Sequence, residues 1–184
     1  MNSVEKVGIP DIQSSADDRQ LAIDKVGIKG LRHPLKIAEM GGSAQSTVAV
    51  LDMFVALPKH LKGTHMSRFV EILNRRVGIV SADSFKDMVH EMLVVLEAKT
   101  GSIEMSFPFF MEKEAPISKV LSLMDYQVCF LGSVVEGDYT FSVKVVVPVK
   151  SLCPCSKEIS DYGAHNQRSH VTITAELSLS LIHI

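Results

Sequence analysis

The sequence predicts an α+β protein in which an antiparallel sheet carries two helices packed on one face. Segments with apolar residues at every second position flank two segments in which apolar residues recur every three or four positions. The strand and helix patterns occur in blocks and do not alternate, as they would around a parallel sheet. A hairpin signal, Glu136-Gly137-Asp138, joins two of the later strands.

The first predicted strands follow a polar start. Residues 1–24 show no sustained periodicity and predict a flexible N-terminal arm. Lys25 to Ile37 alternates but is interrupted by glycine and proline, which is typical of an edge strand. Val48 to Leu57 is rich in Val, Leu and Phe and stops before Pro58. We therefore expect the fold to open with a hairpin.

Two helices are predicted next. Ser67 is placed to cap a helix that runs to about Arg76. A longer helix is expected from about Ser84 to Lys99, and its one-sided apolar stripe is typical of a core face and not of a cofactor site. The stripe consists of Phe85, Met88, Val89, Met92, Leu93 and Leu96.

After Gly101 the apolar period changes to two, which predicts further strands. An irregular segment from Ser151 to Ser169 interrupts them. The expected strands are Ile103 to Met111, Val120 to Val135, Tyr139 to Lys150 and Val171 to Leu177. We divide the chain into a first strand-strand-helix-helix-strand-strand module over residues 25–150, and a loop with the start of a second module over residues 151–178.

Composition excludes several classes of protein. With 184 residues, 46% of them hydrophobic, the chain can bury a real core and is not a disordered tail. A net charge of −2 gives no overall field for nucleic acid or an anionic membrane, so neither is an expected partner. Unbroken apolar runs such as Met92 to Leu96 are far shorter than the roughly 20 residues of a spanning helix. Three cysteines and no leader pattern indicate a soluble protein of a reducing cytoplasm.

The last six residues are set aside. Residues 179–184, Leu-Ser-Leu-Ile-His-Ile, look like an in-frame translation of a widely used sequencing adapter, CTG TCT CTT ATA CAC ATC. The alternative is an ordinary apolar strand end. On the adapter interpretation the natural protein continues past Ser178, the chain is truncated, and His183 is no ligand candidate.

The segment Ser151 to His170 carries the chemistry. It contains Cys153, Cys155, His165 and His170 between two predicted strands. Thiolate and imidazole suit a borderline-soft ion such as Zn²⁺, and a catalytic site uses three protein ligands with one open position. The spacing alone is weak, because the loop could equally hold buried thiols. A disulfide between Cys153 and Cys155 would be strained and is not expected.

Two motifs in this segment carry a family resemblance. Cys-Pro-Cys-Ser-Lys-Glu-Ile-Ser, from Cys153, and Gly-Ala-His-Asn-Gln-Arg-Ser, from Gly163, resemble the signature of the type IB GTP cyclohydrolases. Gly63 to Phe69, Gly-Thr-His-Met-Ser-Arg-Phe, also matches. The similarity covers roughly Asp24 to Leu177 and implies a tunnelling fold.

The resemblance implies a metal site. Cys155, the second cysteine of the motif, and His165 would be metal ligands, with Cys153 a neighbour. The family's third ligand and its guanine-anchoring residue are glutamates further along, which cannot be placed on this sequence. The chain as written is therefore expected to lack a complete, active site.

The implied reaction converts GTP and water to 7,8-dihydroneopterin triphosphate and formate, the first step of tetrahydrofolate synthesis. Water activated by Zn²⁺, Mn²⁺ or Fe²⁺ would attack C8 of the purine, and a general acid would protonate N7. His170 could be imagined as that acid, although a surface or core histidine is the more economical interpretation.

Phosphate-binding candidates come from two places. His65, Ser67 and Arg68 lie at a predicted helix N-terminus, where free N–H groups favour anions. The alternative is that Ser67 only caps the helix and Arg68 is a solvated charge. Gln167 and Arg168, beside the metal histidine, are weaker candidates. The family also implies a homo-oligomer, expected to be a tetramer.

Two other functions remain open. A nitrile-reducing enzyme of queuosine synthesis shares the fold but uses a cysteine nucleophile and a nicotinamide cofactor, and its Glu-Ser-Lys-Ser motif is absent here. The other is a non-catalytic metal- or pterin-binding module.

Overall fold

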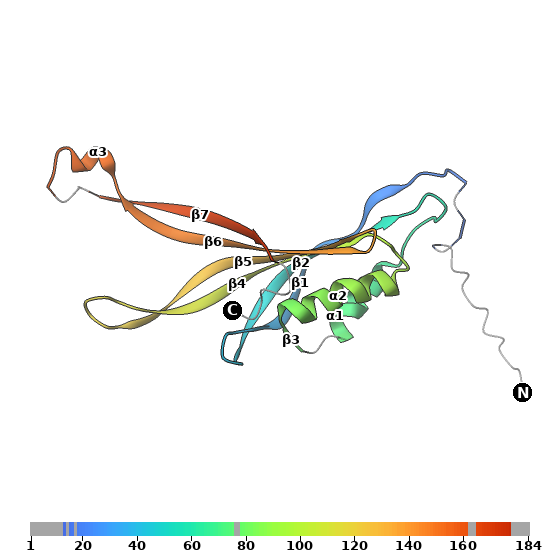
Figure 1. The fold of residues 1–184 in the computed structure, drawn as a ribbon, viewed down its shortest axis with the longest axis horizontal. Helices are drawn as coiled ribbons and strands as arrows, with labels where there is room; N and C mark the ends of the chain where they lie inside the picture. Colours follow the sequence, from blue (N-terminus) through green and yellow to red (C-terminus); the bar gives the residue numbers. More distant parts are fainter. Residues whose placement is uncertain (1–12, 14, 17, 76–77, 162–164, 178–184) are drawn as a thin grey trace, which may run out of the picture.

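The fold is a single seven-stranded sheet with helices on part of one face, as the computed structural model in Figure 1 shows. The structure describes residues 13, 15–16, 18–75, 78–161 and 165–177. Strands and helices follow one another as β1 (Ile23–Ala38), β2 (Ala44–Leu57), α1 (Met66–Arg75), β3 (Ile79–Val80), α2 (Ala82–Val95), β4 (Gly101–Glu114), β5 (Leu121–Val135), β6 (Asp138–Leu152), α3 (Pro154–Lys157) and β7 (Asn166–Glu176). The predicted α+β class is confirmed.

The strand order is β3-β1-β2-β4-β5-β6-β7, and all neighbours except one pair are antiparallel. The exception is β3, which runs parallel to β1 through Lys36 and Ile37. The expectation of a purely antiparallel sheet is therefore wrong at this edge. Two residues are too few to produce a periodic pattern, so β3 could not be predicted from the sequence.

Helix α2 begins two residues before the expected start. Ser81 is its N-cap: the Ser84 amide donates to Ser81 Oγ at 3.2 Å, and the Ser81 amide donates to Ser84 Oγ at 2.8 Å. This reciprocal pair is a capping box with serine in place of the usual glutamate or glutamine. The helix ends at Val95, short of the predicted Lys99.

Helix α1 begins at Met66, so Ser67 lies within its first turn and is not the cap. The Arg68 amide bonds to the His65 carbonyl at 3.2 Å, which makes His65 the residue at the helix start. The predicted capping role of Ser67 is therefore wrong by two positions, within the range over which helix ends are hard to place.

The hydrophobic core lies between α1, α2 and the strands beneath them. Phe85 of α2 contacts Phe130 and Phe141, with ring centroids 5.6 and 5.8 Å apart. Gly132 of β5 permits this close approach, because a Cβ there would stand 2.8 Å from Phe85 Cε1. The side chains of the predicted α2 stripe, Phe85, Met88, Val89, Met92, Leu93 and Leu96, are all buried.

Beyond the helices the sheet divides into two long hairpins that diverge (Figure 1). The β4–β5 ladder runs on to Glu114 and Leu121, and the β6–β7 ladder runs on to Leu152 and Asn166. Pairing between β5 and β6, however, stops at Gln127 and Val146. We call the opening between the two hairpins the fork.

The predicted domain division falls partly outside the described residues. Within the predicted N-terminal arm, Ala16 forms an isolated bridge with Leu61. Residues 179–184, interpreted as adapter-derived, lie outside the described residues, as does His183. The predicted irregular segment is shorter than expected, because β6 extends to Leu152 and β7 already begins at Asn166.

Candidate metal centre

The cysteine motif and His165 meet at the far end of the β6–β7 hairpin. Leu152 and Asn166 form the last residue pair of the ladder, and the Cys153 amide then donates to the His165 carbonyl at 3.3 Å. The short helix α3 follows and sits at the tip of the molecule (Figure 1). The hairpin thus brings Cys153, Cys155 and His165 to one end of the sheet, although Cys155 and His165 are ten residues apart.

Cys153 occupies the N-cap position of α3 and is buried, with 7% of its surface exposed. Its carbonyl accepts hydrogen bonds from the Ser156 and Lys157 amides, each at 3.2 Å. Hydrogen bonds from the Ser156 backbone, and then from Cys155, lower the pKa of the Cys153 thiol against the opposing effect of desolvation. Gln167 Nε2 lies 3.8 Å from Cys153 Sγ. Sequence reasoning treated Cys153 only as a neighbour.

Cys155 and His165 are both exposed, so each can take up an ion from solvent. All three cysteines are free thiols, and Cys129 lies elsewhere, buried in β5. Within the residues that the structure describes, no group of three or more Cys, His, Asp or Glu side chains is arranged to hold a metal ion. A complete ligand set around Cys155 and His165 is therefore not present in this part of the chain.

The first set of predicted phosphate ligands lies far from this loop. His65, Ser67 and Arg68 belong to the start of α1, under the other part of the sheet (Figure 1). Arg68 Nη1 donates to the Val95 carbonyl at 2.9 Å and lies 3.9 Å from Glu97 Oε1. These contacts tie the guanidinium to the end of α2. Within one chain, the structure does not bring these residues to the cysteine motif.

Gln167 and Arg168 belong to β7 and not to a loop, so their side chains point to opposite faces of the sheet. Gln167 is on the side of Cys153, whereas Arg168 faces a groove of about 500 Å³ at the fork. Sequence reasoning missed most of this groove, because polar residues on both faces of Asn166–His170 hide the strand period. Its lining consists of Met124, Asp125, Gln127, Val146, Pro148, Val149, Lys150, Arg168 and His170.

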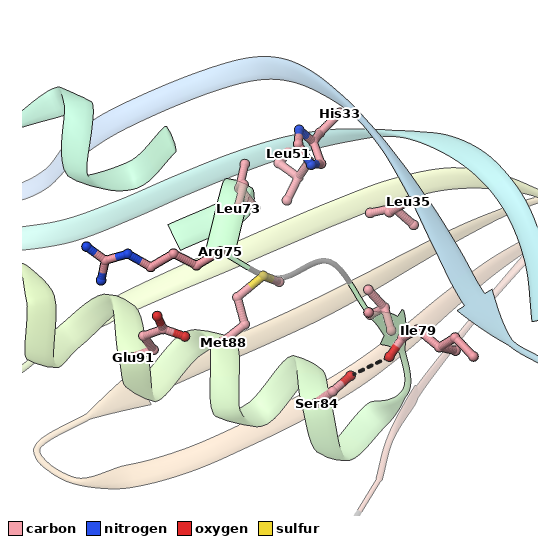
Figure 2. Close-up of a pocket in the computed structure, with 11 residues that line it drawn as sticks. His33, Leu35, Leu51, Leu73, Arg75, Ile79, Ser84, Met88 and Glu91 are labelled. Carbon is pink, nitrogen blue, oxygen red and sulfur yellow. Dashed lines mark hydrogen bonds between the residues drawn. The ribbon is translucent and has the colours of Figure 1, made fainter. Parts of the chain in front are cut away.

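A separate cavity of about 410 Å³ lies between α1, α2, β1 and β3. Figure 2 shows His33 and Leu51 on its sheet side, with Arg75 and Glu91 on the helices at its margin. Ser84 Oγ bonds to the Ile79 carbonyl at 3.3 Å nearby. The described lining contains none of the sequence-predicted site residues, so we treat this cavity as separate from the cysteine motif.

Comparison with known proteins decides the family. A family described as Type I GTP cyclohydrolase folE2 matches residues 9–183. The chain belongs to the type I GTP cyclohydrolase FolE2 family. This confirms the resemblance carried by the cysteine and histidine motifs.

Individual FolE2 relatives agree with this assignment. A protein of Azoarcus sp. named GTP cyclohydrolase FolE2 is 59% identical over 179 residues, which cover 97% of this chain and 66% of the relative. Proteins with the same name from Thiobacillus denitrificans and Aromatoleum aromaticum are 58% and 56% identical, over 92% and 96% of this chain. The matches cover 63% and 65% of these two relatives, so the chain spans just under two thirds of the relatives' length.

The FolE2 resemblance implies a divalent metal, and the donors of the loop are chemically suited to one. A thiol and an imidazole are the ligands preferred by Zn²⁺ and accepted by Fe²⁺ and Mn²⁺ to different degrees. The described residues thus fit part of a ligand set. None of the helices in the described part of this FolE2-family chain is long and apolar enough to cross a membrane.

Proposed function

We propose that this chain carries the metal-binding hairpin of a GTP cyclohydrolase, which converts GTP and water to 7,8-dihydroneopterin triphosphate and formate. The observation that supports the proposal most directly is the pairing of Cys153 with His165 at the end of the β6–β7 ladder. That pairing brings Cys155 and His165 to one tip of the hairpin.

In the proposed site, Cys155 and His165 hold the metal through sulfur and imidazole nitrogen. A divalent ion, whether Zn²⁺, Mn²⁺ or Fe²⁺, supplies Lewis acidity that makes water nucleophilic toward C8 of the purine. Gln167 approaches Cys153 Sγ, and Ser156 Oγ donates to the Cys153 carbonyl at 2.9 Å, so both side chains stabilise the turn between the two ligands. A third donor would have to come from outside the described residues.

For substrate binding we keep the five residues expected from the sequence, namely His65, Ser67, Arg68, Gln167 and Arg168. Arg168 is the best supported, because it lines a groove on the same hairpin as the metal ligands. Arg68 would have to exchange its bonds to α2 for a phosphate. Since His65, Ser67 and Arg68 lie away from the hairpin, they would act in the same site only across a contact between subunits.

The wider proposals follow from the family. We propose a tunnelling fold with a first module over residues 25–150 and the start of a second over 151–178. Assembly into a homo-tetramer, with GTP as substrate and the product directed to tetrahydrofolate in the cytoplasm, completes the proposal. The seven-stranded sheet with two helices on one face is compatible with this arrangement.

A second candidate is a non-catalytic metal- or pterin-binding module. It is favoured by one observation, namely that the described residues contain no group of three or more Cys, His, Asp or Glu side chains arranged to hold a metal ion. Such a module would bind Zn²⁺ or GTP without releasing formate.

The test measures metal content and formate release from GTP in the complete protein, as wild type and with Cys155→Ala or His165→Ala. Removal of either donor should reduce bound Zn²⁺ or Mn²⁺ to background and abolish turnover, because one remaining ligand holds the ion weakly. His60→Ala is the matched control, because His60 is exposed and lies before α1, outside the hairpin. Cys153→Ala should have a milder effect than Cys155→Ala.

Stoichiometric metal and a normal rate in either ligand variant would refute the assignment. If the wild type binds metal and GTP but releases no formate, the binding module becomes the better description.

A further inference from the structure

The cavity of about 410 Å³ between α1, α2, β1 and β3 has mainly apolar walls. Its most buried part is formed by Leu51 of β2, Leu73 of α1 and Met88 of α2, each no more than 4% exposed (Figure 2). The remaining apolar lining consists of Leu35, Ile79 and Val80. Concave, mainly apolar sites of roughly 300–1,000 Å³ are typical of those that bind small organic ligands. The cavity is therefore large enough and apolar enough for such a molecule.

Two features of the sheet leave this space open. Strand β3 pairs with β1 only through Lys36 and Ile37, so no strand of the described residues continues along the edge of β1 to the level of His33. Ala49 stands opposite His33 in the β1–β2 register and contributes only a methyl group to the inward face. Larger side chains would fill the gap between the helices and the sheet here, as they do in the rest of the core.

His33 is the polar exception on the inward face of β1. Its neighbours on that face, Leu31 and Leu35, pack against the hydrophobic core. The imidazole is half-buried and lines the cavity, and over the described residues it makes no hydrogen bond, ion pair or ring contact. A neutral imidazole has one donor and one acceptor, and an unpaired polar group costs free energy in apolar surroundings. A ligand that hydrogen-bonds to His33 would recover part of that cost.

The charged side chains at the margin of the cavity already have interactions. Arg75 Nη2 lies 3.3 Å from Glu71 Oε2 on the same helix, and Glu91 of α2 is not free either. Ser84 belongs to the capping box of α2. Arg75 and Glu91 also have opposite charges, so together they do not favour a ligand of one sign. Among the described lining residues, His33 is thus the polar side chain available to a ligand.

We propose that this cavity binds an uncharged, mainly apolar small molecule, of the size of two fused aromatic rings, which forms one hydrogen bond with His33. Burial of the rings against the apolar walls supplies most of the affinity, and the hydrogen bond sets the orientation. An apolar cavity of about 150 Å³ holds benzene, so the larger volume here accommodates two rings with a substituent. The inference does not depend on the proposed function, because the described lining contains no residue of the β6–β7 hairpin.

The first test measures binding of two probes to the complete protein by equilibrium dialysis at neutral pH. 2-Naphthol and 2-methylnaphthalene have nearly the same shape, but only 2-naphthol can form a hydrogen bond. His33→Leu should weaken binding of 2-naphthol about threefold or more, the equivalent of one hydrogen bond, and should not weaken binding of 2-methylnaphthalene. Failure of the wild type to bind 2-naphthol, or an equal loss for both probes in His33→Leu, would overturn the proposal.

A second test locates the probe in the folded wild type. With ¹³C-methyl methionine in the protein, addition of 2-naphthol should shift the Met88 methyl resonance, because the ring lies against it. Met111 is the matched control: it lines a separate apolar hollow of about 400 Å³ on the open part of the sheet. Met88→Leu identifies the resonance by its loss. A shift of Met111 without a shift of Met88, or no shift of either, would place the probe elsewhere and refute the site.

A third test fills the cavity. Val80→Phe should abolish binding of both probes, because the added ring occupies the space that they need. Val94→Phe is the control, because Val94 is 76% exposed on α2 and lies outside the described lining, and it should bind like the wild type. The Tm of each variant is measured alongside. Undiminished binding in Val80→Phe would contradict the proposal, and if that variant loses its fold, the Met88 shift decides the location.

Cys155→Ala separates this cavity from the candidate metal centre. The variant should bind 2-naphthol as the wild type does, whatever its effect on metal content and formate release, because the two sites share no described residue. A loss of 2-naphthol binding in Cys155→Ala would mean that the probe binds at the metal hairpin, and the cavity would then be a packing gap without a ligand.

Discussion

The part of the sheet beneath α1 and α2 is sealed from solvent, whereas the hairpins beyond it carry apolar side chains in the open. Between the helices and the sheet, side chains of both layers are no more than 2% exposed, namely Phe69, Phe85, Phe107 and Phe141. On the β5 and β7 arms, Leu123 is 72% exposed and Val171 is 45% exposed. Both regions have the same alternation of residues along their strands. The difference in exposure therefore comes from the helices that cover one region, and not from the strands.

The buried core and the candidate site residues therefore lie in different parts of the sheet. Buried apolar area, which is the main favourable contribution to folding, is concentrated under the helices. The candidate metal ligands and the groove at the fork lie on arms that add little to that core. The arms can therefore carry the exposed Cys155 thiol and exposed charged side chains without lowering the stability of the whole fold by much.

The largest expected loss of stability comes from a substitution in the core between the helices and the sheet. Phe85→Ala should reduce the free energy of unfolding by about 3–5 kcal/mol, because it removes a buried ring and leaves a cavity beside Phe130 and Phe141. Leu123→Ala, on the exposed arm, should change it by less than about 0.5 kcal/mol. Urea titration followed by circular dichroism measures both. Similar losses in the two variants would remove the distinction between the regions.

A smaller effect is expected at the start of α2. Ser81→Ala removes the side-chain half of the capping box and should cost about 1 kcal/mol, within the usual range of 0.5–2. Ser122→Ala, an exposed serine on the β5 arm, is the control and should be neutral. A neutral result for both serines would show that the helix start does not depend on its cap.

The smallest effect on stability is expected at Tyr139, at the edge of the helix-covered core, and it has the opposite sign to the two losses above. Its buried hydroxyl has no hydrogen-bond partner in the described part of the chain, so Tyr139→Phe should leave stability unchanged or raise it slightly at neutral pH. Tyr126→Phe is the comparison, because the Tyr126 hydroxyl contacts Met124 Sδ at 3.6 Å. Chemical denaturation near pH 7 measures both variants.

Alkaline pH sharpens the same test. Burial, with smaller contributions from Asp83 and Asp87, raises the pKa of Tyr139 to about 12, above the ordinary tyrosine value of 10.0. Because the folded-state pKa lies above the unfolded one, this contribution to stability is complete below pH 10 and is lost as the pH rises toward 12. The wild type should lose stability more steeply than Tyr139→Phe across this range. Parallel curves for the two proteins would contradict the burial of the hydroxyl.

Much of the fold could be predicted because local signals agreed with it. The Glu136-Gly137 hairpin is a clear case: φ is 53° at Glu136 and 97° at Gly137, the left-handed values that such a turn requires. Features set by tertiary contact could not be predicted. β3 is only two residues long and exists through its pairing with β1, and Asn166–His170 is polar on both faces, which hid the strand.

The candidate site was predictable only in part, for a similar reason. The residue types and the family motif made Cys155 and His165 candidate ligands, and the hairpin explains why they lie at one end of the sheet. Lys150, which lines the groove at the fork, could not be singled out from the sequence. Its position opposite Arg168 is set by the β6–β7 register. The N-cap position of Cys153 depends on α3, a helix of four residues that is too short for any periodic pattern.

The fork has one further consequence, for self-association. Past Gln127 and Val146, the facing edges of β5 and β6 have no strand partner in the described residues, so rows of backbone N–H and C=O groups are left open. Such edges act as templates for an additional β-strand, from another protein or from another copy. Concentrated solutions of this chain should therefore aggregate through the hairpin arms before the helix-covered half begins to unfold.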